Sequence, residues 1–147
     1  MTDTTSRALA MSHAVRDFLS EPTLKFATLA TIDPDGTARQ AVIWYRFDDG
    51  QIIINSRAGR RWPTNLLRDP RASIAIADPL DGYRWVGMTG SATPIPDQAT
   101  AQADIAAMAR RYHADDPADA ERQVAQFETQ ERISFRFRPA AIHEHLE

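Results

Sequence analysis

The chain has 147 residues, of which 43% are hydrophobic and 25% are charged, and its formal net charge is −3. This size and balance are typical of one globular domain with a core large enough to fold alone, so residues 1–147 are expected to form a single domain. The lack of cysteine excludes disulfides, thiolate catalysis and zinc–thiolate sites. The acidic balance argues against a nucleic-acid-binding protein, which should be strongly basic.

The sequence contains no apolar run long enough to span a membrane. Residues Met1 to Met11 are polar and include Asp3, so they lack the basic and apolar regions of a secretory signal. We therefore expect a cytoplasmic protein without a membrane partner.

The first half of the chain predicts an antiparallel meander. Met11 to Ser20 has the apolar spacing of a short amphipathic helix. Three strands are expected next, joined by the turns DPDG and DDG: Leu24 to Ile32, Thr37 to Phe47 and Gln51 to Asn55.

The second half predicts a short helix, two strands, two helices and a final strand. These are Pro63 to Arg68, Arg71 to Asp78, Tyr83 to Ile95, Pro96 to about His113, Asp116 to Glu128 and Arg132 to Leu146. Gly87 and Gly90 inside the fifth strand suggest bulges, as barrels need at their corners.

Together these elements predict a mainly β (α+β) protein, a six-stranded antiparallel barrel with helices packed against it. Period-two alternation assigns to its interior the side chains of Phe26, Leu29, Ile43, Ile53, Ile74 and Ile76.

A basic loop lies between the third strand and the first of the later helices. Arg57, Arg60 and Arg61 precede a helix start, where unpaired N–H groups and a partial positive charge stabilise an anion. Gly59 allows close backbone approach to a ligand, and Pro63 suits the first helical position. Because arginine matches phosphate oxygens in pairs, the loop indicates a phosphate site.

The same basic stretch has a simpler interpretation. A solvated loop, with Arg68 and Arg71 paired to Asp69 or Asp78, fits these residues equally well. The residues alone leave both interpretations open.

Five motifs occur in a fixed order: LAT from residue 29, DG from 35, SRAGR from 56, NLLRDPR from 65 and DGYRWV from 81. In this order and spacing the chain resembles the pyridoxamine-5′-phosphate-oxidase-like split-barrel flavoproteins, and within them the enzymes that use the deazaflavin coenzyme F420. The resemblance covers about Leu24 to Ile95 and, more loosely, the last strand.

The resemblance implies an FMN-binding split barrel that forms a homodimer with cofactor sites at the interface. It implies hydride transfer from coenzyme F420, or alternatively FMN, to a small conjugated or unsaturated substrate. By matching position, it assigns the cofactor site to Gln40, Val42, Trp44, Asn55, Ser56, Arg57, Arg60, Arg61, Trp62, Asn65, Tyr83 and Trp85. Tyr83 and Trp85 are expected to come from the second subunit.

Two positions depart from the pattern, because many relatives carry lysine at Trp62 and arginine at Thr64. The phosphate contacts are therefore expected to depend on Arg57, Arg60 and Arg61. Trp62 lies in a polar arginine loop, so we expect it outside the core. For Trp44 and Trp85, packing in the core or at an interface is the favoured alternative to a role in the site.

No metal site and no catalytic residue are predicted. The four histidines, His13, His113, His143 and His145, have no metal-ligand spacing, and no Ser-His-Asp pattern is present. This is consistent with hydride chemistry carried by a cofactor, which the protein needs only to bind and orient. A non-catalytic carrier of a flavin, deazaflavin or haem-like ligand remains the alternative of another class, whereas the C-terminal RFRPAAIHEHLE argues against pyridoxamine-phosphate oxidation itself.

Overall fold

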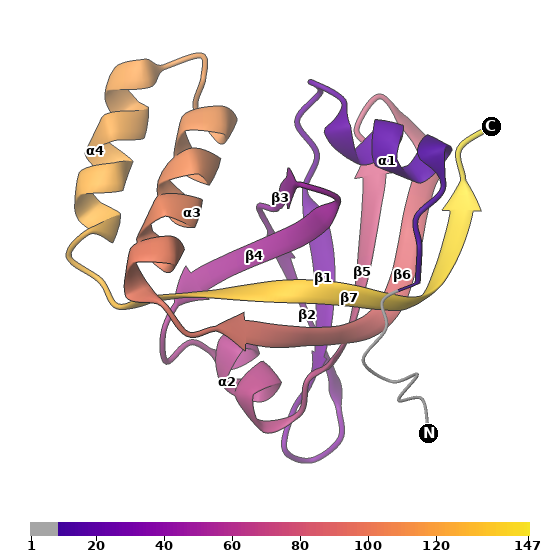
Figure 1. The fold of residues 1–147 in the computed structure, drawn as a ribbon, viewed down its shortest axis with the longest axis horizontal. Helices are drawn as coiled ribbons and strands as arrows, with labels where there is room; N and C mark the ends of the chain where they lie inside the picture. The colour runs from indigo at the N-terminus through magenta and orange to yellow at the C-terminus, as the bar shows by residue number, and fades with distance from the viewer. Residues whose placement is uncertain (1–8) are drawn as a thin grey trace.

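A curled antiparallel sheet dominates the computed structural model, which describes residues 9–147 (Figure 1). Its seven strands follow the order β2-β1-β5-β6-β7-β4-β3. Their bounds are β1 Ala27–Ile32, β2 Ala38–Ile43, β3 Arg46–Asp48, β4 Gln51–Arg57, β5 Arg71–Asp78, β6 Asp81–Ile95 and β7 Arg132–His145. The fold is a mainly β split barrel, as predicted.

The sheet has seven strands rather than six because the predicted strand Thr37 to Phe47 is broken in the middle. Strand β2 pairs with β1 at one edge of the sheet, whereas β3 pairs with β4 at the other edge. The chain crosses between these edges at Trp44 and Tyr45. The Tyr45 side chain is buried at this crossing, and its hydroxyl donates a hydrogen bond to the Leu19 carbonyl over 3.4 Å.

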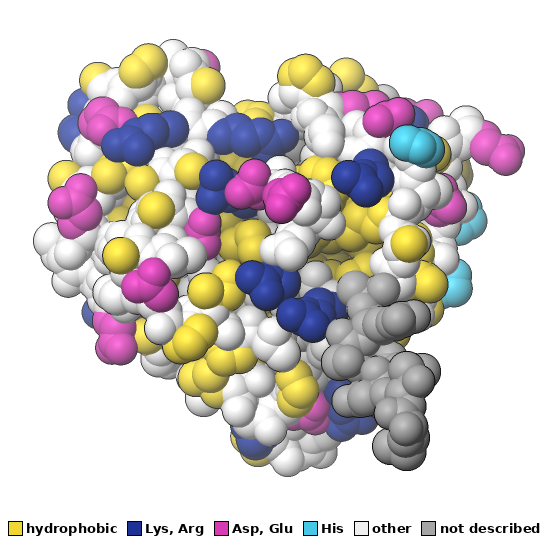
Figure 2. Space-filling view, viewed as in Figure 1, with side chains coloured by type: hydrophobic (Ala, Val, Ile, Leu, Met, Phe, Trp, Pro, Cys, Tyr) yellow, Lys and Arg dark blue, Asp and Glu magenta, His cyan; other side chains and the backbone are white. Residues whose placement is uncertain are grey.

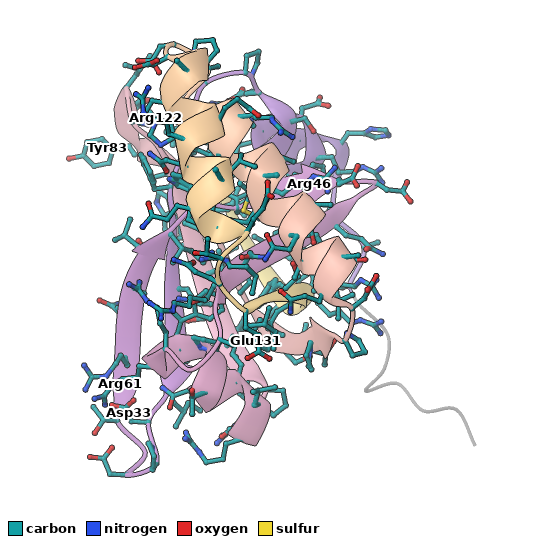
Figure 3. The ribbon with its side chains drawn as sticks, turned by 90° about the vertical axis from the view of Figure 1, so that its left-hand side faces the viewer. Asp33, Arg46, Arg61, Tyr83, Arg122 and Glu131 are labelled. Atoms are coloured by element: carbon teal, nitrogen blue, oxygen red, sulfur yellow. The ribbon has the colours of Figure 1, made fainter. Side chains whose placement is uncertain are left out.

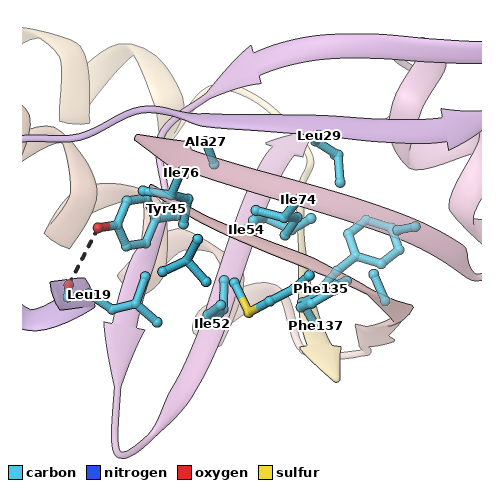
Figure 4. Close-up of a cluster of buried hydrophobic side chains, with 14 of the residues drawn as sticks. Leu19, Ala27, Leu29, Tyr45, Ile52, Ile54, Ile74, Ile76, Phe135 and Phe137 are labelled. Carbon is cyan, nitrogen blue, oxygen red and sulfur yellow. Dashed lines mark hydrogen bonds between the residues drawn. The ribbon is translucent and has the colours of Figure 1, made fainter. Parts of the chain in front are cut away.

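The main core lies inside the curled sheet (Figure 4). Leu29, Ile74 and Ile76 are fully buried there, as the alternation predicts, and Ile43 packs partly buried against the same cluster. Ile53 instead contacts residues of helix α3 in a second cluster outside the barrel.

The prediction for Phe26 is wrong, since its side chain is 52% exposed. Its neighbours Lys25 and Ala27 are both buried. Because successive residues of an extended chain point to opposite sides, Phe26 must face outward.

Four helices flank the sheet: α1 His13–Ser20, α2 Arg61–Arg68, α3 Gln98–Tyr112 and α4 Pro117–Phe127. Helices α3 and α4 form a hairpin inserted between β6 and β7 and stand beside the barrel (Figure 1). Asp97 and Asp116 cap their N-termini by accepting hydrogen bonds from the backbone N–H groups of Ala99 and Asp119. No helix among residues 9–147 is both long and apolar enough to cross a membrane.

A buried lysine fastens α1 to the start of β1. The Lys25 ammonium donates to the Phe18 carbonyl over 3.0 Å and pairs with the Glu21 carboxylate, also over 3.0 Å. Arg84 of β6 holds the other Glu21 oxygen at 2.7 Å. Hydrogen bonds from Arg84 and then Lys25 lower the pKa of Glu21 to about 2.

We expect Glu21→Gln to lower the free energy of unfolding by about 1–3 kcal/mol at neutral pH, because it leaves a buried ammonium without its carboxylate. The ionised carboxylate stabilises the fold fully above its unfolded-state pKa of about 4.5, and this contribution is lost as the pH falls toward about 2. Denaturant unfolding between pH 7 and pH 2.5 should therefore show a shallower decline for the variant. Glu128→Gln is the control, because the Glu128 side chain is exposed and makes no hydrogen bond or ion pair within residues 9–147. Parallel declines for Glu21→Gln and the wild type would contradict this role.

Candidate functional site

A cavity of about 490 Å³ lies between the α3–α4 hairpin, the barrel and the start of α2. Fifteen residues from seven parts of the chain line it. These are Phe26, Val42, Ile43, Trp44, Asn55, Ser56, Arg57, Arg60, Trp62, Ile105, Met108, Gln126, Phe127, Gln130 and Arg132. One end of this cavity is basic and the other is apolar and aromatic.

Three arginines form the basic end. Arg57 ends β4 and lies directly opposite Arg132, the first residue of β7, while Arg60 precedes α2. Within residues 9–147, the guanidinium groups of Arg57 and Arg60 make no hydrogen bond or ion pair. Both charges are therefore available to a ligand.

Arg132 is only 8% exposed, although no carboxylate of the described residues pairs with it. Its Nε donates to Asn55 Oδ1 over 3.1 Å and its Nη1 donates to Gln130 Oε1 over 2.7 Å. Burial, followed by the charges of Arg60 and Arg57, lowers the pKa of Arg132 to about 10. An anion at this end would offset the mutual repulsion of the three cations.

The backbone around Arg60 adds to this positive end. Helix α2 begins at Arg61, so the N–H groups of Arg61 and Trp62 lie in its first turn, and no side chain caps them. Pro63 occupies the third helical position, not the first as predicted, and its missing N–H still falls where no intrahelical partner exists. Gly59 has a φ of 91°, which requires glycine in the turn that presents these groups.

Aromatic rings form the other end of the cavity. The Trp44 ring stacks on Tyr112 with centroids 5.0 Å apart and an angle of 11°, and Phe127 meets Trp44 edge-on at 6.5 Å. The Tyr112 hydroxyl donates to the Lys25 carbonyl over 2.5 Å, which fixes this stack to the chain before β1. Ile105 and Met108 of α3 extend the apolar wall.

A buried hydrogen-bond network supports the cavity from the side of α3. Asn55 Nδ2 donates to the Ala101 carbonyl over 2.9 Å and to Ser134 Oγ over 3.0 Å. Ser134 donates to Asp104, whose other oxygen accepts from Arg46, both over 2.7 Å. The Asn55 amide is thus held by the protein and orients Arg132 rather than pointing freely into the cavity.

The structure brings seven of the twelve predicted site residues to this cavity: Val42, Trp44, Asn55, Ser56, Arg57, Arg60 and Trp62. The expectation that Trp62 lies outside the core is wrong. It is 9% exposed and packs on the Phe135 ring at 5.7 Å while it also lines the cavity.

The other five residues do not line the cavity. Arg61 Nη1 lies 3.5 Å from Asp33 Oδ2. Figure 3 shows these two side chains next to each other. Asn65 is buried and donates to Asp33 over 2.9 Å, so it holds α2 against the end of β1. Gln40 is exposed on β2, Trp85 stacks on His145 at 4.2 Å, and Tyr83 is 92% exposed and projects away from the molecule (Figure 3).

Sequence reasoning missed Arg132 and the residues of the helical hairpin. Arg132 lies far from the basic loop in the sequence, and only the pairing of β4 with β7 sets it opposite Arg57. Ile105, Met108 and Phe127 carry no motif, because apolar residues of a helix look alike whether they face a core or a cavity.

The curled antiparallel sheet with its flanking helices defines a split-barrel protein. The family model described as pyridoxamine 5′-phosphate oxidase matches residues 11–137, so the chain belongs to this family. No curated protein matches the sequence.

Solved structures of the same fold carry differing descriptions. A conserved hypothetical protein, Rv2991 from Mycobacterium tuberculosis, is 25% identical with a TM-score of 0.73, covering 98% of this chain and 91% of the other. A protein described as an F420 reductase is also 25% identical with a TM-score of 0.66, covering 86% and 94%. The haem storage protein HutZ from Vibrio cholerae is 14% identical with a TM-score of 0.64, covering 92% and 95%, and so shares the fold alone.

Proposed function

We propose that this protein is an oxidoreductase that uses the deazaflavin coenzyme F420 to transfer hydride to a small conjugated or unsaturated substrate. The observation that carries the proposal is the two-ended cavity, with Arg57, Arg60 and the buried Arg132 at one end and the Trp44 stack at the other. The similarity to a protein described as an F420 reductase supports it.

The residues fit a planar ring system with a phosphate-bearing tail. Arg57, Arg60 and Arg132 would hold the phosphate, because its negative charge supplies a counterion that Arg132 lacks among the described residues. Trp44 and Met108 would lie against the ring and exclude water from one side of it. A bound deazaflavin supplies the hydride.

FMN is the alternative cofactor, since it also combines a flat ring with a phosphate. A carrier that stores a flavin, deazaflavin or haem-like ligand is the alternative of another class, and haem-binding neighbours of the same fold support it. The lining of the cavity includes no histidine among the described residues, so a haem would receive no imidazole ligand from it.

Titration of the purified protein with FMN and with oxidised F420, followed by quenching of tryptophan fluorescence, tests the cofactor. We expect F420 to bind more tightly than FMN. Loss of absorbance of the reduced deazaflavin on addition of a panel of electron-poor alkenes tests turnover. Tight F420 binding without turnover of any alkene favours the carrier, and failure of both ligands to bind contradicts the proposal.

We further propose a symmetric homodimer in which Tyr83 and Trp85 border the partner's cavity. Tyr83 is 92% exposed and Val42, at the rim of the cavity, is 71% exposed, so both leave apolar surface for a second subunit to cover. The interface should bury roughly 2,000 Å² or more, as obligate dimers do. Light scattering at micromolar concentration should give twice the mass of 16.5 kDa, and a monomeric mass would count against this assembly.

A further inference from the structure

A second cavity, of about 360 Å³, lies between α1, the turn joining β3 to β4, and the middle of β7. It shares no lining residue with the cavity of the proposed function. Arg16 of α1 and Arg136 and Arg138 of β7 line it. Figure 2 views this side of the molecule, where Lys and Arg side chains border a hollow in the surface.

The strand geometry directs two of these arginines to the cavity. Arg136 and Arg138 are two residues apart on β7, so they lie on one face of the sheet. Phe135 and Phe137 alternate with them and pack into the core on the other face. The strand cannot turn its arginines elsewhere without exposing these two rings.

Two of the three arginines, Arg16 and Arg136, lack an acceptor within the described residues. The guanidinium groups of Arg16 and Arg136 make no hydrogen bond or ion pair there, and Arg136 Nε is buried without an acceptor. A buried donor that lacks an acceptor destabilises the folded state, and native proteins seldom leave one without a reason. Asp49, the acidic residue of the lining, is exposed at the rim.

The exposed side chain of Arg16 extends from α1 toward the β3–β4 turn. Its Nη2 lies 3.5 Å from the point where a Cβ would stand on Gly50, so the guanidinium reaches across to the β3–β4 turn. Gly50 has a φ of 73°, which glycine adopts without strain. The arginines of α1 and β7 therefore converge on one space from two sides.

We propose that Arg16, Arg136 and Arg138 form a second anion-binding site, which takes the phosphate group of a compact phosphate monoester. A phosphate oxygen supplies the acceptor that Arg136 Nε lacks, and guanidinium groups bind such oxygens in pairs. The cavity is larger than one phosphate, and Leu9, Met11 and Pro139 give it an apolar part for an organic group. A hydrogen bond of 2.7 Å from the Leu9 N–H to the Pro139 carbonyl holds this part in place.

Calorimetric titration of the whole chain with inorganic phosphate and with phenyl phosphate tests the site. Arg60→Ala weakens anion binding at the first cavity and leaves the second cavity unchanged, so the titrations are made in that background. There, Arg136→Met and Arg16→Met should each weaken phenyl phosphate about ten- to hundredfold, the effect of one lost charge-assisted hydrogen bond. Arg122→Met, which removes a cation that is 67% exposed on α4, is the control and should change nothing.

Thermal unfolding without phosphate separates a binding role from a structural one. Arg136→Met keeps the aliphatic stem and removes the uncompensated donor, so its melting temperature should equal or exceed that of the parent. Tighter binding of phenyl phosphate than of inorganic phosphate supports a monoester, and equal affinity identifies free phosphate as the ligand. The site is refuted if neither probe binds in the Arg60→Ala background, or if both arginine variants bind as the parent does. These outcomes are independent of whether the first cavity binds a cofactor.

Discussion

Replacing Arg60 with alanine is expected to weaken FMN or F420 binding about ten- to hundredfold while leaving the fold intact. Arg60 lines the cavity, and no described residue uses its guanidinium. A hydrogen bond to a charged group contributes about 1.5–3 kcal/mol, and each 1.4 kcal/mol is about tenfold in the dissociation constant. Fluorescence titration measures the loss, which should shrink as the salt concentration rises, since ions screen an exposed charge.

The neighbouring residue provides the control. Arg61 carries the same charge one position later, but it points to Asp33 at 3.5 Å and does not line the cavity. Arg61→Ala should therefore change affinity little. Arg68 at the other end of α2 is unsuitable as a control, because its guanidinium donates to the Ile32 carbonyl and to Asn65 Oδ1 and so holds α2 in place. Equal effects of Arg60→Ala and Arg61→Ala would mean that the basic loop acts only through its net charge.

Gly90→Ala is expected to cost about 3 kcal/mol or more of the free energy of unfolding. A Cβ at this position would stand 2.0 Å from the Arg138 carbonyl oxygen and 3.0 Å from the Ala140 nitrogen. Both atoms belong to the backbone of β7, so no side chain can move aside to relieve the clash. The pairing of β6 with β7 shifts register between Thr89 and Gly90, which is the bulge that brings the two backbones so close.

Gly82→Ala is the matched substitution, because it lies in the same strand and its Cβ would meet nothing within 4 Å. Thermal and denaturant unfolding should find this variant close to wild type. Similar stability of the two variants would contradict this prediction, because it would mean that β6 and β7 can move apart at the bulge without lowering the free energy of unfolding.

Local patterns predicted most of the architecture. Alternating apolar residues located β1 and β5 and assigned Leu29, Ile74 and Ile76 to the core, since a strand with one buried face leaves this trace in the sequence. The break between β2 and β3 left no such trace. The run through Trp44 and Tyr45 is apolar throughout, and the crossing depends on how far the whole sheet curls.

The residues of the candidate site were also predicted only where their positions depend on neighbouring residues in the sequence. Arg57 and Arg60 were predicted because the strand end, the glycine turn and the helix start are contiguous in the sequence. Arg132 was missed because β7 brings it to the cavity from the end of the chain. Trp62 was misplaced because its polar neighbours hide the side of α2 that packs on Phe135.

Because the α3–α4 hairpin is an insertion, the two ends of the cavity are built largely from different parts of the chain. The hairpin connects β6 to β7, and these two strands pair with each other up to Ile95 opposite Ser134. Residues 96–131 therefore leave the sheet and return to the same ladder. The hairpin supplies Ile105, Met108 and Phe127 to the aromatic end, whereas the barrel and α2 supply Arg57, Arg60 and Arg132 to the basic end. In the proposed function, substitutions at Ile105 and Met108 should therefore change the space for a substrate while leaving Arg57 and Arg60 in place. Phe127 is different, because its ring lies 4.6 Å from the Arg132 guanidinium and so belongs to both ends. Ile105 and Met108 are thus the positions at which to alter substrate preference by design.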